Sequence, residues 1–314
     1  MKNSRQLVAV ILLLNLLWAP VNLVVSTATA GGFSPLAIGL LRWTFLSCLL
    51  IGLLQTAWFK KLTNYKSMPV GEWLKALGLG LVFFGPAHLM FYSAMSMTSE
   101  VEGTVLQTTA PLWTAVIGFF VLKEDVPLRR WIAIGLSMIG AYIVTVGFRL
   151  PALMDHTAGN LVYGLAVLME SLMGVFAASL TRRNSGIGTL TGQMCGGAIA
   201  FILCSLLFKS QFPFVVPSFN LVSYWPLLYL IFLAGLFTFV TWYRIVETVP
   251  LTLMVLSCAI QPPVAALLVW VVRGTVPTSD TVIGAIIIMI ALLIGYLGGK
   301  REAVLNVDPP GPGG

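Results

Sequence analysis

The chain has 314 residues, of which 58% are hydrophobic and only 9% are charged. A soluble globular domain carries roughly 25% charged residues, so the composition excludes a water-soluble protein and indicates an integral membrane protein. The formal net charge of +7 does not indicate nucleic-acid binding, because the basic residues lie in short loops between apolar stretches, where they set membrane orientation.

Apolar windows bounded by lysine and arginine predict an all-α membrane protein of ten transmembrane helices, since a span needs about 20 consecutive apolar residues. The first unit, 1–150, holds spans near 7–28, 35–57, 74–96, 101–122 and 131–148. The second unit, 151–302, holds spans near 160–180, 189–208, 224–245, 250–272 and 281–299. The tail, 303–314, is rich in proline and glycine and is predicted to be a disordered cytoplasmic end.

The loops between these spans alternate in charge. Fourteen lysines and arginines fall on one side, and three, Arg149, Lys209 and Arg273, fall on the other. Because basic loops stay in the cytoplasm, this asymmetry predicts that both termini are cytoplasmic. We expect a multi-pass protein of the plasma membrane, which in a bacterium is the inner membrane.

The second half of the chain repeats the first. A shift of 151 residues superposes Tyr92 on Tyr243 and Pro111 on Pro262. Each half holds five spans, an odd number, so the second half must cross the membrane with opposite polarity. The sequence therefore predicts an inverted repeat, an arrangement common in transporters.

The segment Pro111–Glu124 and the following Asp125–Trp131 resemble the end of an EamA domain in the drug/metabolite transporter superfamily. Leu41–Trp43 and Trp18 agree with this resemblance, whereas Thr275 stands where the second unit should carry an acidic residue. The resemblance implies a ten-helix metabolite transporter, often an exporter, with a central cavity between two five-helix units.

Three ionisable residues lie at membrane depth, Arg42, His88 and Glu170, where a charge costs at least about 2.5 kcal/mol unless it is paired or hydrated. Arg42 and Glu170 lie at similar depths. One hypothesis is that Glu170 accepts a proton or a substrate amine while Arg42 binds a substrate carboxylate. The alternative is a structural ion pair. His88 follows Gly85-Pro86 and is either a proton sensor or a core residue.

Other candidates for the cavity wall are aromatic, amide or proline residues at membrane depth. Mid-span prolines loosen the backbone where it lines a cavity, and aromatic rings stack on apolar or cationic groups. For each residue, helix packing or an interhelical hydrogen bond is the alternative. The set comprises Trp18, Asn22, Tyr92, Gln107, Pro111, Trp113, Tyr243 and Gln261.

Small residues recur every four positions in the seventh span, at Gly188, Gly192, Gly196 and Ala200. Such a strip lets another helix backbone approach closely. It predicts helix packing first, and second a surface for subunit contact in a homodimer or for sliding during the transport cycle.

The leading functional hypothesis is a secondary transporter that moves a small organic metabolite, an amino acid or related solute, outward by alternating access. Glu170 and His88 are the candidates for proton coupling. The alternatives are an integral membrane enzyme acting on lipid, and a channel or scaffold. No HExxH, GxSxG or Walker A motif occurs and the four cysteines lack metal-ligand spacing, so we predict no catalytic residue, cofactor or metal. The expected partners are a small-molecule substrate and membrane lipid.

Overall fold

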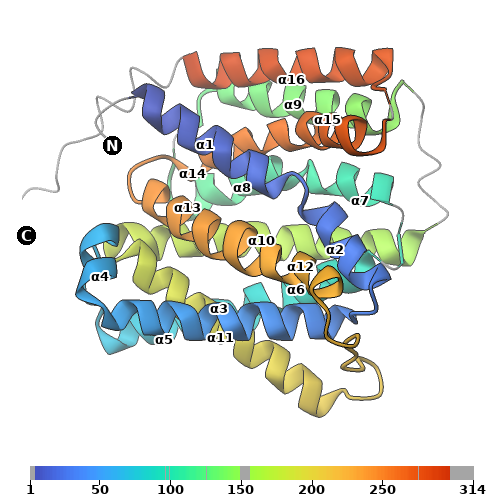
Figure 1. Cartoon of the computed structure of the whole chain (residues 1–314). Helices are drawn as coiled ribbons and strands as arrows, with labels where there is room; N and C mark the ends of the chain where they lie inside the picture. Colours follow the sequence, from blue (N-terminus) through green and yellow to red (C-terminus); the bar gives the residue numbers. More distant parts are fainter. Residues whose placement is uncertain are drawn as a thin grey trace, which may run out of the picture.

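The structure is a computed structural model that describes residues 4–95, 97–98, 100–124, 126–148, 156–274 and 276–297. Within these residues all regular secondary structure is helical (Figure 1). The tail 303–314, Arg149 and Thr275 lie outside the described residues.

The first half forms helices near each of its five predicted spans, several of them interrupted. The short helix α4, which carries Lys60 and Lys61, was not predicted. The elements are α1 (Ser4–Trp18), α2 (Val21–Ala30), α3 (Pro35–Gln55), α4 (Ala57–Thr63), α5 (Val70–Leu79), the π-helix η1 (Gly80–Phe84), α6 (Gly85–Ala94), α7 (Glu100–Gln107), α8 (Ala110–Val121) and α9 (Leu128–Val146).

The second half repeats this order, except that the single helix α10 corresponds to α1 and α2 and that α4 has no counterpart. Its elements are α10 (Thr157–Arg183), α11 (Gly186–Leu207), α12 (Leu221–Leu228), the π-helix η2 (Tyr229–Phe237), α13 (Thr238–Val246), α14 (Leu251–Ser257), the 3₁₀ turn η3 (Cys258–Ile260), α15 (Gln261–Arg273) and α16 (Ser279–Leu297).

Eight helical segments in the described part of the chain are long and apolar enough to cross a membrane. The predicted fourth and tenth spans correspond to two shorter apolar helices, Val105–Val121 and Ser279–Gly295. The chain is therefore a multi-pass membrane protein, and the total of ten spans stays a prediction.

Two of the interruptions fall at equivalent places in the two halves. The third long helix of each half contains a π-helix, η1 or η2. The next helix is divided at its centre, between α7 and α8 in the first half and at η3 in the second. Pro111 and Pro262 stand at the starts of the outgoing helices. Because proline has no N–H and cannot complete the i→i−4 bond, both breaks follow directly from the sequence.

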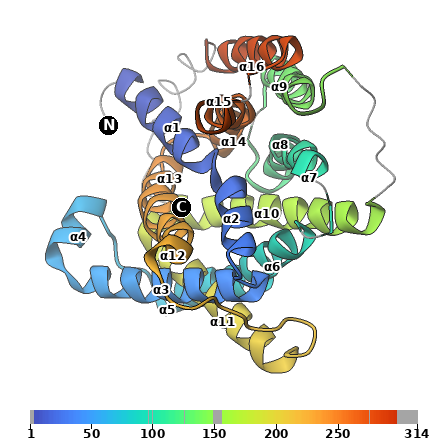
Figure 2. The same cartoon turned by 45° about the vertical axis from the view of Figure 1, so that its right-hand side comes forward.

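The connections gather at two ends of the helix bundle (Figures 1 and 2). We call one the basic end, which holds the connections 56–69, 122–127, 184–185 and 247–250 and helix α4. The opposite end holds the connections 31–34 and 208–220 and the described residues 97–98 between α6 and α7.

Glycines bring α11 against the α5–η1 helix of the other half. A Cβ atom at Gly196 would overlap the Leu77 carbonyl oxygen, and one at Gly80 would overlap that of Gln193. The glycine strip of α11 is thus covered within the chain, which supports its packing interpretation and leaves it unavailable for contact with a second subunit.

Large apolar side chains cover the outside of the bundle. Phe120 is 74% exposed, Leu161 70% and Val222 81%. Exposure of this kind on helices of spanning length marks the surface that contacts lipid acyl chains.

Candidate functional site

A cavity of about 440 Å³ lies between the two halves of the bundle. Its wall is formed by α1, α2, α3, α6, α7, α8 and α9 from the first half and by α10, α13, α14, η3 and α15 from the second. It extends from Val246 and Leu251 near the basic end to Thr98 and Gly103 near the opposite end. This volume is in the range of pockets that hold small organic molecules.

The structure brings all but one of the predicted site residues to this cavity. The lining residues are Trp18, Asn22, Arg42, His88, Tyr92, Gln107, Pro111, Glu170, Tyr243 and Gln261. Trp113 is not among them, and its side chain is 39% exposed. Pro111 and Thr114 face the cavity, and Trp113 is rotated by about 100° from Thr114 around the helix. The cavity-facing position predicted for Trp113 is therefore wrong.

Arg42 is held by the protein itself. Its Nη1 donates to the Tyr92 hydroxyl at 3.1 Å and its Nη2 donates to the Ala234 carbonyl at 3.1 Å. The guanidinium carbon lies 4.2 Å from the centroid of the Trp43 ring. Arg42 therefore joins α3, α6 and η2 through its two terminal nitrogens, and because the residue is only 4% exposed it is poorly accessible to a solute carboxylate.

No ion pair forms between Arg42 and Glu170 among the described residues. The Ala234 carbonyl that binds Arg42 lies in the π-helix η2, where it also accepts from Trp18 Nε1 at 3.3 Å. An α-helical carbonyl is normally taken up by its own helix, and the π-helix makes this one available to two side chains.

The second half carries an equivalent of the Arg42–Tyr92 contact. The Tyr243 hydroxyl donates to Gln193 Oε1, and both residues follow their counterparts by 151 positions. Gln193 was not predicted as a site residue, although its offset from Arg42 is the signal that would have found it. The two tyrosine contacts therefore belong to the scaffold of the repeat.

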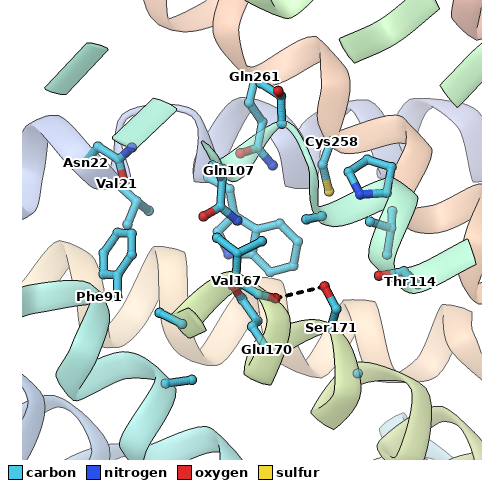
Figure 3. A pocket seen from close by; sticks show the side chains of 18 of the residues that line it. Val21, Asn22, Phe91, Gln107, Thr114, Val167, Glu170, Ser171, Cys258 and Gln261 are labelled. Carbon is cyan, nitrogen blue, oxygen red and sulfur yellow. Dashed lines mark hydrogen bonds between the residues drawn. The ribbon is translucent and has the colours of Figure 1, made fainter. Parts of the chain in front are cut away.

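Glu170 has a different environment from Arg42. It lies on α10, its side chain is exposed, and it lines the cavity beside Gln107 of α7 (Figure 3). The two side chains are within hydrogen-bonding reach of each other. Gln107 Oε1 is buried without a partner in the described part of the chain. Glu170 thus offers a carboxylate to whatever enters the cavity.

His88 is packed among aromatic rings. Its ring centroid is 4.1 Å from that of Phe84 and 4.7 Å from that of Trp43. Its Nδ1 lies 2.9 Å from the Phe84 carbonyl oxygen, which can only accept, so Nδ1 carries the proton of this bond. These contacts favour the core interpretation of His88.

Gln261 is also engaged by the scaffold. Its Nε2 donates to Asn15 Oδ1 at 2.9 Å, and Asn15 Nδ2 donates to Ser257 Oγ at 2.9 Å. Asn15 is fully buried. This network ties α1 to the break between α14 and α15 and fixes the cavity wall at that point.

An aromatic wall faces the cavity beside these polar groups. The Trp18 ring centroid lies 5.0 Å from that of Trp242 and 5.6 Å from that of Phe239. All three residues line the cavity. Phe239 was not predicted, because an aromatic residue in an apolar span carries no signal of the side it faces.

A network around Glu124 joins the two halves at the basic end. Glu124 accepts from Arg182 Nη2 at 2.8 Å, from the Leu251 backbone N–H at 3.2 Å and from Thr252 Oγ1 at 3.1 Å. Arg182 also donates to the Val249 carbonyl at 3.3 Å. This Glu124 network joins the end of α8 to the end of α10 and to the start of α14. It closes the bundle at the basic end of the cavity.

Two related halves with matching helix breaks around a cavity lined by both define a duplicated membrane-protein fold of the kind found in transporters. The chain belongs to the EamA-like transporter family, which matches it twice, over residues 6–146 and 157–297. The two matches are offset by the same 151 residues that align the halves.

Several curated proteins are similar over most of their length. The uncharacterized transporter YdfC of Bacillus subtilis (strain 168) is 23% identical over 269 residues, covering 85% of this chain and 83% of YdfC. The S-adenosylmethionine uptake transporter of Rickettsia prowazekii (strain Madrid E) is 22% identical over 290 residues, or 92% of each chain. A solved crystal structure with 18% identity superposes with a TM-score of 0.74, covering 96% of this chain and 99% of that one, and shows the same fold.

Proposed function

We propose that this protein is a secondary transporter that carries a small organic solute by alternating access. The observation that supports this most directly is a cavity between two related halves with the Glu124 network across one end of it. A carrier needs such a closure, because a cavity open at both ends is a pore.

The repeat supports a second arrangement in which the other end closes. At the basic end α8 packs against the start of α14. The 151-residue offset converts this pair into α15 and the start of α7, at the opposite end. If each half adopted the conformation that the other half now has, α15 would contact α7 and α8 would separate from α14. Inverted-repeat transporters alternate access by an exchange of this kind.

The loop charges support assigning the basic end to the cytoplasm. With that orientation we propose that the Glu124 network is an inner gate and that the cavity opens toward the outside. We propose an amino acid or a related amine as the solute and export as the direction. The relative named an S-adenosylmethionine uptake transporter makes uptake the competing direction.

Proton coupling is assigned to Glu170 rather than His88, because Glu170 is exposed to the cavity whereas His88 is packed between aromatic rings. We expect Glu170→Gln to abolish the pH dependence of transport and His88→Ala to retain it. The initial rate of solute flux between pH 5.5 and 8 measures both, and an unchanged pH profile in Glu170→Gln refutes coupling through this carboxylate.

The test of transport is counterflow in proteoliposomes. Vesicles loaded with an unlabelled amino acid or amine should transiently accumulate the labelled solute, and the rate should saturate. Glu247→Gln is the matched control, because Glu247 accepts from the Gly186 N–H at 2.9 Å within one half and does not line the cavity. Flux without saturation or counterflow would indicate a channel, and no flux of any amino acid, amine or nucleoside would refute the proposal.

A further inference from the structure

We infer that the cavity selects solutes by a protonated nitrogen, that Glu170 and Gln107 are the residues that determine this specificity, and that a solute carboxylate is not required. The inference rests on the proposed transport function and narrows its substrate class to organic ammonium compounds with an apolar or aromatic body.

The two charged residues that line the cavity, Arg42 and Glu170, differ in how accessible they are to a solute. Both terminal nitrogens of Arg42 are used by Tyr92 and Ala234, and the residue is 4% exposed. Glu170 is exposed. A solute entering the cavity therefore meets a negative group that can form a charge-assisted hydrogen bond and no equally available positive one.

Three hydroxyl groups that line the cavity act as donors within the protein, whereas the Tyr163 hydroxyl has no partner in the described part of the chain. The hydroxyl protons of Thr108, Ser137 and Ser171 are donated to carbonyls of their own helices. Their oxygens keep only lone pairs for a ligand. One amide proton of Gln261 and the Nδ1 proton of His88 are likewise engaged inside the protein.

Gln107 adds two acceptors at the centre of the cavity. Its Oε1 atom is buried and has no partner among the described residues. Its backbone carbonyl lies four residues before Pro111, which has no N–H to donate back to it. A buried acceptor without a donor costs free energy, so an N–H group from a bound solute is the complement that these atoms lack.

The apolar part of such a solute has a place beside this acceptor group. Trp18, Phe239 and Trp242 form the aromatic wall of the cavity, with centroid separations of 5.0 and 5.6 Å. Aromatic rings pack well on apolar groups and attract cations through their faces. A zwitterion also fits the ammonium position, but both terminal nitrogens of Arg42 already donate within the protein and only the buried Nε is left for its carboxylate.

Three probes, each with one phenyl ring, distinguish an amine, a zwitterion and a carboxylate as ligands. They are 2-phenylethylamine, phenylalanine and 3-phenylpropanoate. Binding to the purified full chain is measured by scintillation proximity with tritiated 2-phenylethylamine and the other two as competitors. We expect the amine to bind at least about tenfold more tightly than the carboxylate, since the difference is one charge-assisted hydrogen bond. Equal or tighter binding of 3-phenylpropanoate would overturn the inference.

Variants locate the effect. Glu170→Gln should weaken amine binding at least about tenfold and leave 3-phenylpropanoate unchanged, and Gln107→Leu should weaken amine binding several-fold. Glu247→Gln, a carboxylate outside the cavity, should change neither affinity. A melting curve of each variant shows that it is folded, and Glu170→Asp, which keeps the charge, should recover part of the affinity. Full amine affinity in a folded Glu170→Gln protein overturns the assignment.

The outcomes separate this inference from the proposed function. Counterflow of phenylalanine or 3-phenylpropanoate that is unaffected by Glu170→Gln would leave a transporter but reject ammonium selection. Glu170-dependent amine binding without movement of any solute would keep the binding site and reject transport. Absence of both binding and flux for all three probes would reject both.

Discussion

Replacing Glu124 with glutamine tests the gate at the basic end, because the side chain keeps its shape and loses its charge. In the native protein Glu124 accepts from Arg182 at 2.8 Å and from two groups at the start of α14. Glu124 is 9% and Arg182 31% exposed, so the pair is only partly screened. Hydrogen bonds to charged groups are worth roughly 1.5–3 kcal/mol, and we take about 2 kcal/mol for the lost charge.

That free energy applies only to the state in which α8 meets α14. A loss of about 2 kcal/mol lowers the ratio of outward-open to inward-open protein about 30-fold. Reporters are Val21→Cys and Ala178→Cys, both at cavity-lining positions, in a background in which Cys48, Cys195, Cys204 and Cys258 are alanine. The ratio of labelling from outside at residue 21 to labelling from inside at residue 178 follows the equilibrium.

Glu247→Gln is the control, because its bond to Gly186 joins two helices of the same half and is kept in both states. Exchanging the charges, Glu124→Arg with Arg182→Glu, should return the labelling ratio part of the way. The reasoning is refuted if Glu124→Gln leaves the labelling ratio unchanged, or if Glu247→Gln alters it as much.

Three further outcomes follow from the packing. Arg42→Ala should lower the free energy of unfolding by about 2 kcal/mol, because it leaves the Tyr92 and Ala234 oxygens without a charged donor. The melting temperature in detergent measures this loss, and an unchanged value would contradict the structural role of Arg42. Trp18→Ala should weaken solute binding while Trp113→Ala, outside the cavity, should not; equal losses in competition binding would place both in the wall. Gly196→Ala should lower the free energy of unfolding by about 1–3 kcal/mol, because the added methyl group overlaps the α5–η1 helix. Gly164 has open space around it, so Gly164→Ala should not lower the melting temperature in the same assay.

The apolar pattern and the prolines account for most of what could be predicted. Helices occur near every predicted span because only helices satisfy the backbone in lipid. The breaks at Pro111 and Pro262 are local consequences of a missing N–H. Hydropathy alone places the Glu170 carboxylate at membrane depth, where a charge is unfavourable unless it faces a cavity or a partner. These features need no knowledge of tertiary contacts.

Other features depend on contacts between distant residues. Arg42 was paired in prediction with Glu170, but it binds the Ala234 carbonyl, which only the π-helix η2 makes available. Nothing in an apolar segment signals a π-helix. Trp113 was misplaced for a related reason, because the angular position of a residue on an apolar helix cannot be read where every face is apolar.

The repeat also separates scaffold from specificity. Arg42 and Gln193 occupy equivalent positions, and each binds the tyrosine of its own half, so the symmetric positions carry contacts that both conformations need. Glu170 is equivalent to Ala19, which also lines the cavity, and Gln107 to Cys258. Chemistry that favours an ammonium group is thus found where the halves differ. We propose that alternation depends on the paired positions and recognition on the unpaired ones, so that changes at residues 107 and 170 alter the solute without disabling the exchange.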